Sequence, residues 1–111
     1  MEIKRGDIVY MTDKEGCVMR TRPYLIVSND IGNRHSDIVL GTPLTTRMRK
    51  PDQPTHCIVG FRKSMVLAEQ IVTIRKEDIN RVVLHVDDMT EVDKCLIASL
   101  GIGGYDGSNV A

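Results

Sequence analysis

The chain has no excess of charge of either sign and no long apolar run. Its 15 Lys and Arg residues balance its 15 Asp and Glu residues, so it lacks the global positive field of a protein that binds nucleic acid through net charge alone. No run approaches the length that spans a bilayer, and residues 1–6 do not resemble a signal peptide. These absences predict a cytoplasmic protein without membrane association, in which any nucleic-acid site is local.

Cysteine is scarce as well. Cys17, Cys57 and Cys95 are odd in number and form no C-x-x-C pair, which argues against a disulfide framework and against a zinc site. None of the three histidines has ligand spacing with another His or Cys. We therefore predict a reduced protein with no metal and no cofactor. Among the histidines, His56 is the best candidate for a general base, although a histidine at a strand start is more often packed or solvated.

The length of 111 residues predicts one small domain, assigned to residues 1–102, followed by a flexible tail at 103–111 that is rich in glycine. Short β-type runs separated by turn residues predict a mainly β protein, a small barrel or curled sheet. The strands are expected at residues 7–11, 24–28, 38–42, 56–59, 66–74 and 82–86. Residues 29–36 hold too many turn formers for a strand and predict a connecting loop with a short helical turn.

Near the C-terminus the apolar period becomes helical. One face carries Met89, Val92, Leu96 and Leu100. Asp88 is placed to cap the helix, with Glu91 three residues on as in a capping box, and Gly101 is placed to end it in a left-handed conformation. The sequence therefore predicts one C-terminal helix that covers the sheet or a partner subunit.

Two short segments suggest a site that grips a phosphodiester. Arg22 carries a permanently charged fork beside an apolar strand, and Thr45 offers a small hydroxyl after the next strand. Taken alone, Arg22-Pro23 is more simply a turn leading into a sheet, and Thr45-Thr46 is equally a strand end bonded to local backbone. Together they suggest RNA cleavage, with the spacing from Arg22 favouring Thr45 over Thr46.

Further basic and polar residues surround these two segments. Arg20 precedes Arg22, while Arg47, Arg49 and Lys50 follow the threonine pair, and each alone reads as an ordinary solvated residue. Together such residues form a groove that attracts RNA or an acidic disordered peptide.

Several motifs, in order along the chain, resemble those of MazF/PemK-type toxins. They are Lys4-Arg5-Gly6-Asp7-Ile8-Val9-Tyr10, Arg22-Pro23, Ser28-Asn29-Asp30-Ile31-Gly32-Asn33, Pro43-Leu44-Thr45, Pro54-Thr55-His56, Glu69-Gln70-Ile71 with Thr73-Ile74, and His85-Val86-Asp87-Asp88. The resemblance implies an SH3-like or CcdB-like β-barrel with a C-terminal helix. It also implies a homodimeric toxin that cuts single-stranded mRNA at selected sequences and is silenced by a cognate antitoxin.

The resemblance also implies roles for individual residues. Arg22 and Thr45 match the catalytic pair and Gln70 matches a position that holds RNA; a buried, satisfied amide is the alternative for Gln70. The RNA-binding set is Gln70, Thr46, Arg20, Arg47 and Arg49. Because an arginine stays protonated near pH 7, Arg22 suits charge stabilisation on the phosphate, and the Thr45 hydroxyl suits a hydrogen bond to a phosphate oxygen. Attack by the ribose 2′-OH then gives a 2′,3′-cyclic phosphate and a 5′-hydroxyl.

Two positions depart from the family's pattern. The loop expected at residues 12–21 is shorter than usual and lacks the family's Glu-Gln-Gly stretch, and Val72 stands where many relatives carry arginine. The second departure predicts weaker phosphate binding with a shallower salt dependence. Two competing functions therefore stay open: a CcdB-like toxin that acts by binding gyrase, and a degenerate barrel that binds RNA or an antitoxin without chemistry.

Overall fold

The computed structural model describes residues 2–15 and 18–105. Cys17 and residues 106–111 of the expected tail lie outside them. Within the described residues the elements are β1 (Asp7–Glu15), β2 (Val18–Ile26), α1 (Asp30–His35), β3 (Ile38–Thr45), β4 (His56–Val59), β5 (Ser64–Leu67), β6 (Val72–Arg75), β7 (Ile79–His85) and α2 (Thr90–Leu100), with 3₁₀ turns at Lys76–Asp78 and Ile102–Gly104.

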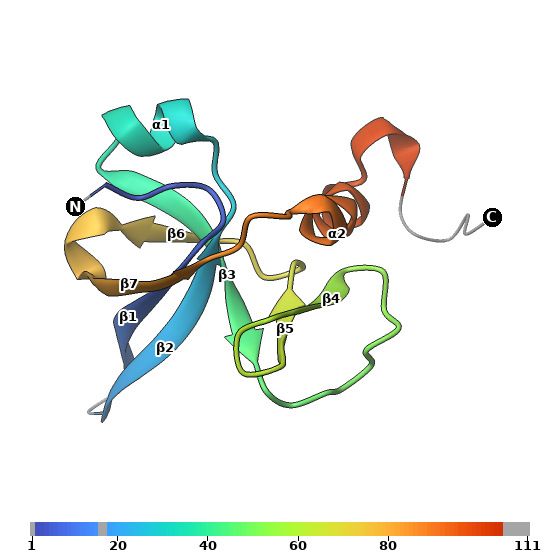
Figure 1. Cartoon of the computed structure of the whole chain (residues 1–111), viewed down its shortest axis with the longest axis horizontal. Helices are drawn as coiled ribbons and strands as arrows, with labels where there is room; N and C mark the ends of the chain where they lie inside the picture. The colour runs from blue at the N-terminus through green and yellow to red at the C-terminus, as the bar shows by residue number, and fades with distance from the viewer. Residues whose placement is uncertain (1, 16–17, 106–111) are drawn as a thin grey trace.

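All the strand pairs are antiparallel, and β3 is the strand on which the sheet turns (Figure 1). One side of β3 pairs with β2, while its other side pairs first with β6, opposite residues 38–41, and then with β5, opposite Leu44 and Thr45. The strand order is β4-β5-β3-β2-β1-β7. Within the described residues no pairing joins β4 to β7, so the sheet is a curled, barrel-like sheet that stays open.

Local features explain the curl. The pairing of β1 with β7 shifts register between Ile8 and Val9 and again between Tyr10 and Met11, and such irregularities bend a strand and increase its twist. Gly41 lies where β3 passes from one partner to the next. A Cβ atom there would stand 2.6 Å from Cδ1 of Ile74 and 3.3 Å from the carbonyl oxygen of Leu25, so any larger residue would have to shift the Ile74 side chain and crowd the β2 backbone.

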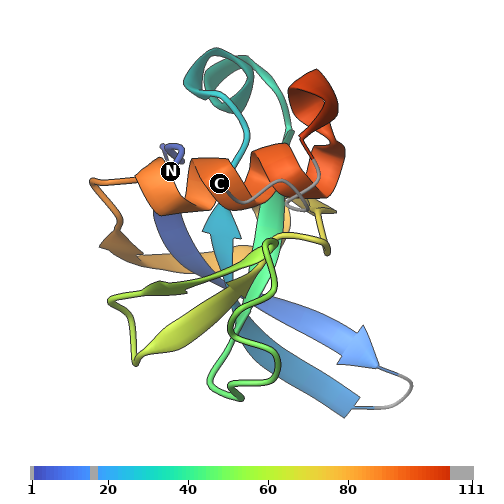
Figure 2. The ribbon, with the colours of Figure 1, turned by 90° about the vertical axis from the view of Figure 1, so that its right-hand side faces the viewer.

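Two apolar clusters hold the molecule together. One lies inside the curled sheet and includes Val9, Ile26 and Ile74, each at most 1% exposed. The other lies between the sheet and α2 and includes Leu25, Val66 and Val92. Figure 2 shows α2 lying across the sheet above β4 and β5. The predicted mainly β fold with a covering C-terminal helix is confirmed.

Helix α2 forms where the sequence predicts it, but its N-cap is Met89 and not Asp88, and no side chain of the N-cap residue bonds the helix. Oδ1 of Asp88 accepts a hydrogen bond from the Thr90 amide at 3.0 Å, and Gly101 ends the helix at φ 64°. The Glu91 carboxylate accepts from Nζ of Lys94 at 3.3 Å instead of completing a capping box. Leu100 is 59% exposed, so its placement on the buried face was wrong; it sits at the end of the helix, beyond the sheet. Neither described helix is long and apolar enough to cross a membrane.

Several predicted strand bounds need correction. The run at residues 66–74 is two strands, because a hydrogen-bonded turn from Leu67 to Gln70 follows β5 before β6 begins. The expected loop at 12–21 is, in its described part, a continuation of β1 and β2, which pair as a hairpin from Ile8 opposite Leu25 to Glu15 opposite Val18 (Figure 1). Arg20 and Thr21 in this part of β2 are both exposed, so the sequence shows no apolar alternation there.

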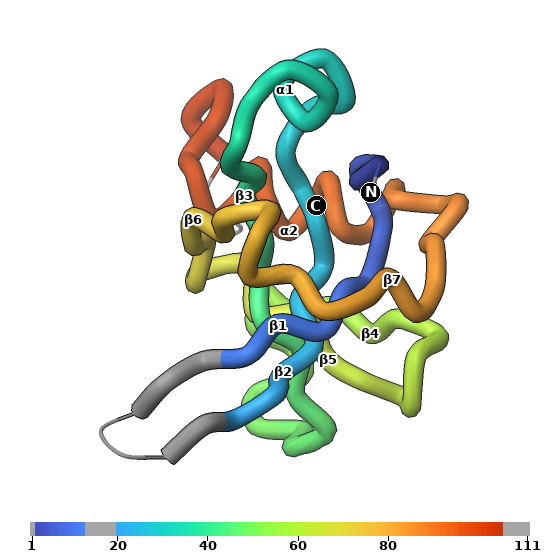
Figure 3. The backbone as a smooth tube through the Cα atoms, turned by 90° about the vertical axis from the view of Figure 1, so that its left-hand side faces the viewer, coloured from blue at the N-terminus to red at the C-terminus, as the bar shows by residue number. Residues whose placement is uncertain are grey.

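The predicted connector between β2 and β3 contains α1. Oδ1 of Asn29 accepts from the Gly32 amide at 2.7 Å, which caps the helix, and Asn33 is buried and donates to the Ser28 carbonyl at 2.9 Å. Figure 3 shows α1 at the end of the molecule opposite the β1–β2 hairpin. Asn29 and Asn33 thus stabilise the connector between β2 and β3 through hydrogen bonds to its backbone.

Candidate active site

A cavity of about 510 Å³ opens between β2, the end of β3 and the turn that joins β4 to β5. We call it the main cavity. Six of the seven predicted site residues line it: Arg20, Arg22, Thr45, Thr46, Arg47 and Gln70. These residues come from three separate parts of the chain, and the pairing of β3 with both β2 and β5 brings them together.

Arg22 lies within β2, opposite Met11 of β1, and is half-buried. Arg22-Pro23 is therefore part of a strand, and the alternative of a turn leading into the sheet was wrong. Because side chains alternate along a strand, Arg20 and Arg22 point to the same face, and both line the main cavity. Two guanidinium groups are thus presented on one wall.

Thr45 is the last residue of β3 and stands opposite Met65 of β5. Its Oγ1 atom accepts a hydrogen bond from the Arg47 amide at 3.1 Å, so the alternative of a local backbone bond is also realised. That contact uses a lone pair of the hydroxyl and leaves its proton available as a donor. Thr46 is more exposed and lines the same cavity.

Gln70 follows the turn after β5, with its amide donating to the Leu67 carbonyl at 3.0 Å. Its side chain is exposed, so the alternative of a buried amide within an apolar strand was wrong. Gln70 lines both the main cavity and an adjoining second cavity of about 360 Å³. A ligand that passes from one cavity to the other meets this side chain.

The second cavity holds the predicted residue that the main cavity lacks, Arg49. Its wall carries a hydrogen-bonded cluster around Glu69. Nε2 of His56 lies 2.7 Å from one Glu69 oxygen, Nδ1 of His56 lies 2.9 Å from the Lys50 carbonyl, and Thr55 donates to Glu69 at 2.9 Å. Both ring nitrogens of His56 therefore face protein acceptors, and its side chain is only 8% exposed. These contacts suit a structural role for His56, which holds the loop before β4 in place, and not the role of a general base that faces a substrate.

The other two histidines lie away from both cavities. His85 bonds Asp7 at 2.7 Å, and His35 is an exposed residue at the end of α1. In the described part of the chain no three His, Cys, Asp or Glu side chains come together as a metal site would require. The expectation of a metal-free protein stays a prediction.

The two described cysteines are in contact with each other, and the hydrogen bond with Cys57 lowers the pKa of Cys95, which is buried. A hydrogen bond with the Cys95 thiol and burial between β4 and α2 raise the pKa of Cys57, which keeps its thiol protonated. Neither thiol lines the main cavity. A reaction in this cavity therefore has arginine guanidinium groups and hydroxyls to work with.

The lining residues that were not predicted as site residues include Phe61 and Arg62, in the turn between β4 and β5, and Ser64, which begins β5. The basic pair Arg62-Lys63 next to Gly60 was the available signal, but nothing in the sequence showed that this turn folds against β2 and β3. With Arg62 the main cavity has four arginines, and no acidic residue lines it among those described. Arginines are thus concentrated in the lining of one cavity on a chain of zero net charge.

Val72, which departs from the family's pattern, lies in β6 and packs against the cluster inside the sheet. It lines neither the main nor the second cavity. Its predicted effect on phosphate binding therefore gains no support from the geometry and stays a prediction.

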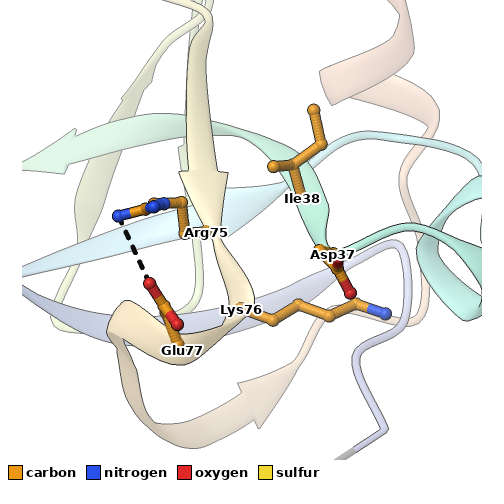
Figure 4. A pocket seen from close by; sticks show the side chains of 5 residues that line it. All are labelled: Asp37, Ile38, Arg75, Lys76 and Glu77. Atoms are coloured by element: carbon orange, nitrogen blue, oxygen red, sulfur yellow. Dashed lines mark ion pairs between the residues drawn. The ribbon is translucent and has the colours of Figure 1, made fainter.

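A third cavity, of about 330 Å³, lies where β6 ends beside the start of β3 (Figure 4). Asp37, Ile38, Arg75, Lys76 and Glu77 line it, and Figure 4 shows the Arg75 side chain directed at Glu77, with 3.2 Å between Nη1 and Oε1. Two cations face two carboxylates here, so this cavity has no net charge to attract an anion.

The fold of this chain matches solved structures of endoribonucleases, with and without an antitoxin. The chain is similar to the structure of an endoribonuclease in complex with its cognate antitoxin from mycobacterial species, with 28% identity, a TM-score of 0.78, and 90% of this chain and 96% of that chain covered. It also shares the fold of a MazE-MazF complex from Deinococcus radiodurans, with 18% identity, a TM-score of 0.76, and 92% and 98% covered.

Sequence similarity is more specific. Residues 4–100 match the family described as PemK-like, MazF-like toxin of type II toxin-antitoxin system. Endoribonuclease EndoA of Bacillus subtilis (strain 168) is 39% identical over 114 aligned positions that cover 92% of this chain and 97% of that protein. The chain belongs to the family of PemK-like, MazF-like toxins, and the resemblance read from its motifs is confirmed.

Proposed function

We propose that this chain is a sequence-selective endoribonuclease that cleaves single-stranded mRNA without a metal, as the toxin of a toxin-antitoxin pair in the cytoplasm. The observation that carries the proposal is the main cavity, which Arg22 and Thr45 line together with Arg20, Arg47 and Arg62. The relative from Bacillus subtilis, which shares 39% identity along nearly its whole length, is itself named an endoribonuclease. No observation favours the gyrase-binding alternative.

The proposed chemistry needs three tasks. The ribose 2′-OH must lose its proton, the extra charge on the phosphate must be stabilised, and the leaving 5′-oxygen must gain a proton. Arg22 supplies charge stabilisation with a fork of donors, and the Thr45 hydroxyl donates to a phosphate oxygen. The Arg47 amide at 3.1 Å holds Thr45 in place for that role. The 2′-oxygen bonds to phosphorus as the bond from phosphorus to the 5′-oxygen breaks. The 2′-OH proton passes to water, and the 5′-oxygen takes a proton from water, with Arg22 in a supporting donor role. The products therefore carry a 2′,3′-cyclic phosphate and a 5′-hydroxyl.

The remaining predicted residues bind the RNA on either side of the cleaved phosphate. Arg20, Arg47 and Thr46 surround the main cavity, and Gln70 leads into the second cavity, where Arg49 lies. The bases of single-stranded RNA expose their Watson–Crick and Hoogsteen edges, and the Gln70 amide offers both a donor and an acceptor for such an edge. We assign sequence selection chiefly to the wall that Gln70 shares between the two cavities.

Two partners follow from surface chemistry. A row of arginines on a protein of zero net charge favours an antitoxin with a disordered acidic segment that occupies the cavity in place of RNA. At the other end of the molecule, Ile31, Ile38 and Leu40 are exposed by 72%, 45% and 39%. Exposed apolar side chains of this kind on α1 and β3 support the proposed homodimer.

The test is incubation of the purified protein with a long single-stranded RNA in EDTA, beside the Arg22→Ala variant, followed by mapping of the product ends. We expect discrete cuts with cyclic-phosphate and 5′-hydroxyl ends from the wild-type protein and none from the variant. Cleavage that stops in EDTA, or ends that carry a 5′-phosphate, would refute the metal-free mechanism. Intact RNA from a folded wild-type protein would refute the nuclease proposal.

A further inference from the structure

The turn between β4 and β5 has an unusual backbone for its sequence. The Ser64 amide donates to the Phe61 carbonyl at 2.9 Å, which closes a four-residue turn. Its two central residues, Arg62 and Lys63, have φ angles of 54° and 51°. A tight hairpin with both central residues in this left-handed region strongly prefers Asn-Gly or Asp-Gly, so two long basic side chains strain the turn.

The turn also holds the single phenylalanine of the chain in the main cavity. The Phe61 ring is half-buried and meets the Tyr10 ring edge to face, with 6.2 Å between centroids and 71° between planes. Cζ of Arg81 lies 5.2 Å from the Tyr10 centroid, which backs this pair, and Cζ of Arg62 lies 5.8 Å from the Phe61 centroid. The Phe61 ring is thus held in place by the Tyr10 ring, while the Arg62 side chain that contacts it is exposed.

These groups match how proteins bind single-stranded nucleic acid. Unstacked bases lie on aromatic rings, and arginine guanidinium groups stack on bases or pair with the backbone phosphates. Phe61 and Arg62 share the main cavity with Arg22, and its volume of about 510 Å³ is within the range of small-ligand sites. A nucleotide bound here is therefore adjacent to the phosphate that Arg22 contacts.

We propose that Phe61 and Arg62 form a subsite for the nucleotide next to the cleaved phosphate, an assignment that rests on the proposed ribonuclease function. The base stacks on the Phe61 ring in place of the Arg62 guanidinium, and the displaced guanidinium pairs with the neighbouring phosphate. Arg62 has a positive φ angle that asparagine adopts more readily, so the arginine lowers the stability of the turn. We infer that it is kept for its contact with the phosphate. Lys63 lines neither cavity and is not part of the subsite.

Two single variants of the turn distinguish an effect on RNA affinity from an effect on stability. Arg62→Asn and Lys63→Gly each relieve one strained residue and remove one charge, but only the first removes a subsite group. We measure affinity by fluorescence anisotropy with a random-sequence 2′-O-methyl RNA pool, whose attacking hydroxyl is blocked, and folding by the melting temperature. We expect Arg62→Asn to weaken binding severalfold and to reduce the slope of log K against log salt by about 0.7, while Lys63→Gly leaves affinity within twofold and raises the melting temperature.

Phe61 is tested by Phe61→Leu, which keeps apolar bulk against Tyr10, and by Phe61→Tyr, which keeps a ring. Loss of one stacked base corresponds to a decrease in affinity of about 5-fold or more. We therefore expect Phe61→Leu to weaken binding by that factor and Phe61→Tyr to bind as tightly as the wild-type protein. Unchanged affinity in both Phe61→Leu and Arg62→Asn would overturn the subsite. Because the probe cannot be cleaved, this result is independent of the EDTA cleavage assay, and failure of one assay does not imply failure of the other.

Discussion

The main cavity and the third cavity each gather charged side chains, at opposite ends of β3. The main cavity, beyond Thr45, is lined by four arginines without a described carboxylate, whereas the third cavity, beside Ile38, sets Arg75 and Lys76 against Asp37 and Glu77. Both cavities have charged linings, but only in the third cavity do carboxylates line the cavity beside the cations. The difference teaches that the signs of the charges that line a cavity, and not the number of charged residues, favour a phosphate there.

The largest expected effect on RNA cleavage comes from removing Arg22, which lines the main cavity. We predict that Arg22→Ala lowers kcat/KM for RNA cleavage by about 1,000-fold or more, because the charge that develops on the phosphate loses its donors. Arg75→Ala in the third cavity is the matched control and should change kcat/KM less than twofold. Cleavage rates of the two variants, measured on one RNA, check the comparison directly, and equal losses would break it.

The next effect distinguishes the two threonines. Thr45→Val keeps the shape of the side chain and removes its hydroxyl, so we expect kcat to fall by about 100-fold with little change in KM. Thr46→Val removes the more exposed hydroxyl of the same cavity and should lower kcat less than tenfold. Steady-state kinetics of both variants decides the assignment, and a larger loss in Thr46→Val would move the catalytic role to Thr46.

A smaller effect concerns the wall of the second cavity. His56→Ala removes the contact with Glu69 at 2.7 Å and the contact with the Lys50 carbonyl at 2.9 Å. We predict a loss of unfolding free energy of about 1–3 kcal/mol, measured by urea denaturation, because buried hydrogen bonds are lost. The cleavage rate of His56→Ala should fall less than tenfold, because His56 positions the wall of the second cavity and does not contact the RNA. A loss of kcat as large as that of Arg22→Ala would instead make His56 a catalytic residue.

The smallest effect lies outside both cavities, at the start of α2. Hydrogen bonds from Thr90 hold the pKa of Asp88 below its usual range, so the folded protein favours the carboxylate over the acid. A lowered pKa means that this stabilisation is present above the carboxyl's unfolded value of 3.8 and is lost as the pH falls through the folded value. We predict that Asp88→Ala lowers the melting temperature by a few degrees at pH 7, less at acid pH, with unchanged kcat. A pH-independent difference in melting temperature would contradict the assignment.

The sequence was sufficient to predict the class of fold and six of the residues that line the main cavity. The apolar periodicity predicted most strands and α2, while the motifs and the basic and polar residues beside them named the six lining residues; their roles stay predictions. The apolar pattern failed where paired residues are exposed, as at Arg20 and Thr21, and where a turn divides an apolar run, as at residues 68–71. Phe61, Arg62 and Ser64 were missed for a related reason: their place depends on β5 pairing with the far half of β3, which no local pattern encodes.

The most direct test of the central claim is a double-mutant cycle of Arg22→Ala and Thr45→Val, with the single-turnover cleavage rate of one RNA as the measurement. If both side chains act on the same phosphate in the main cavity, their effects are not additive, and the double variant is about as slow as Arg22→Ala alone. Losses that multiply would show that the two residues act independently. Full cleavage by the double variant would show that the reaction takes place elsewhere on the protein.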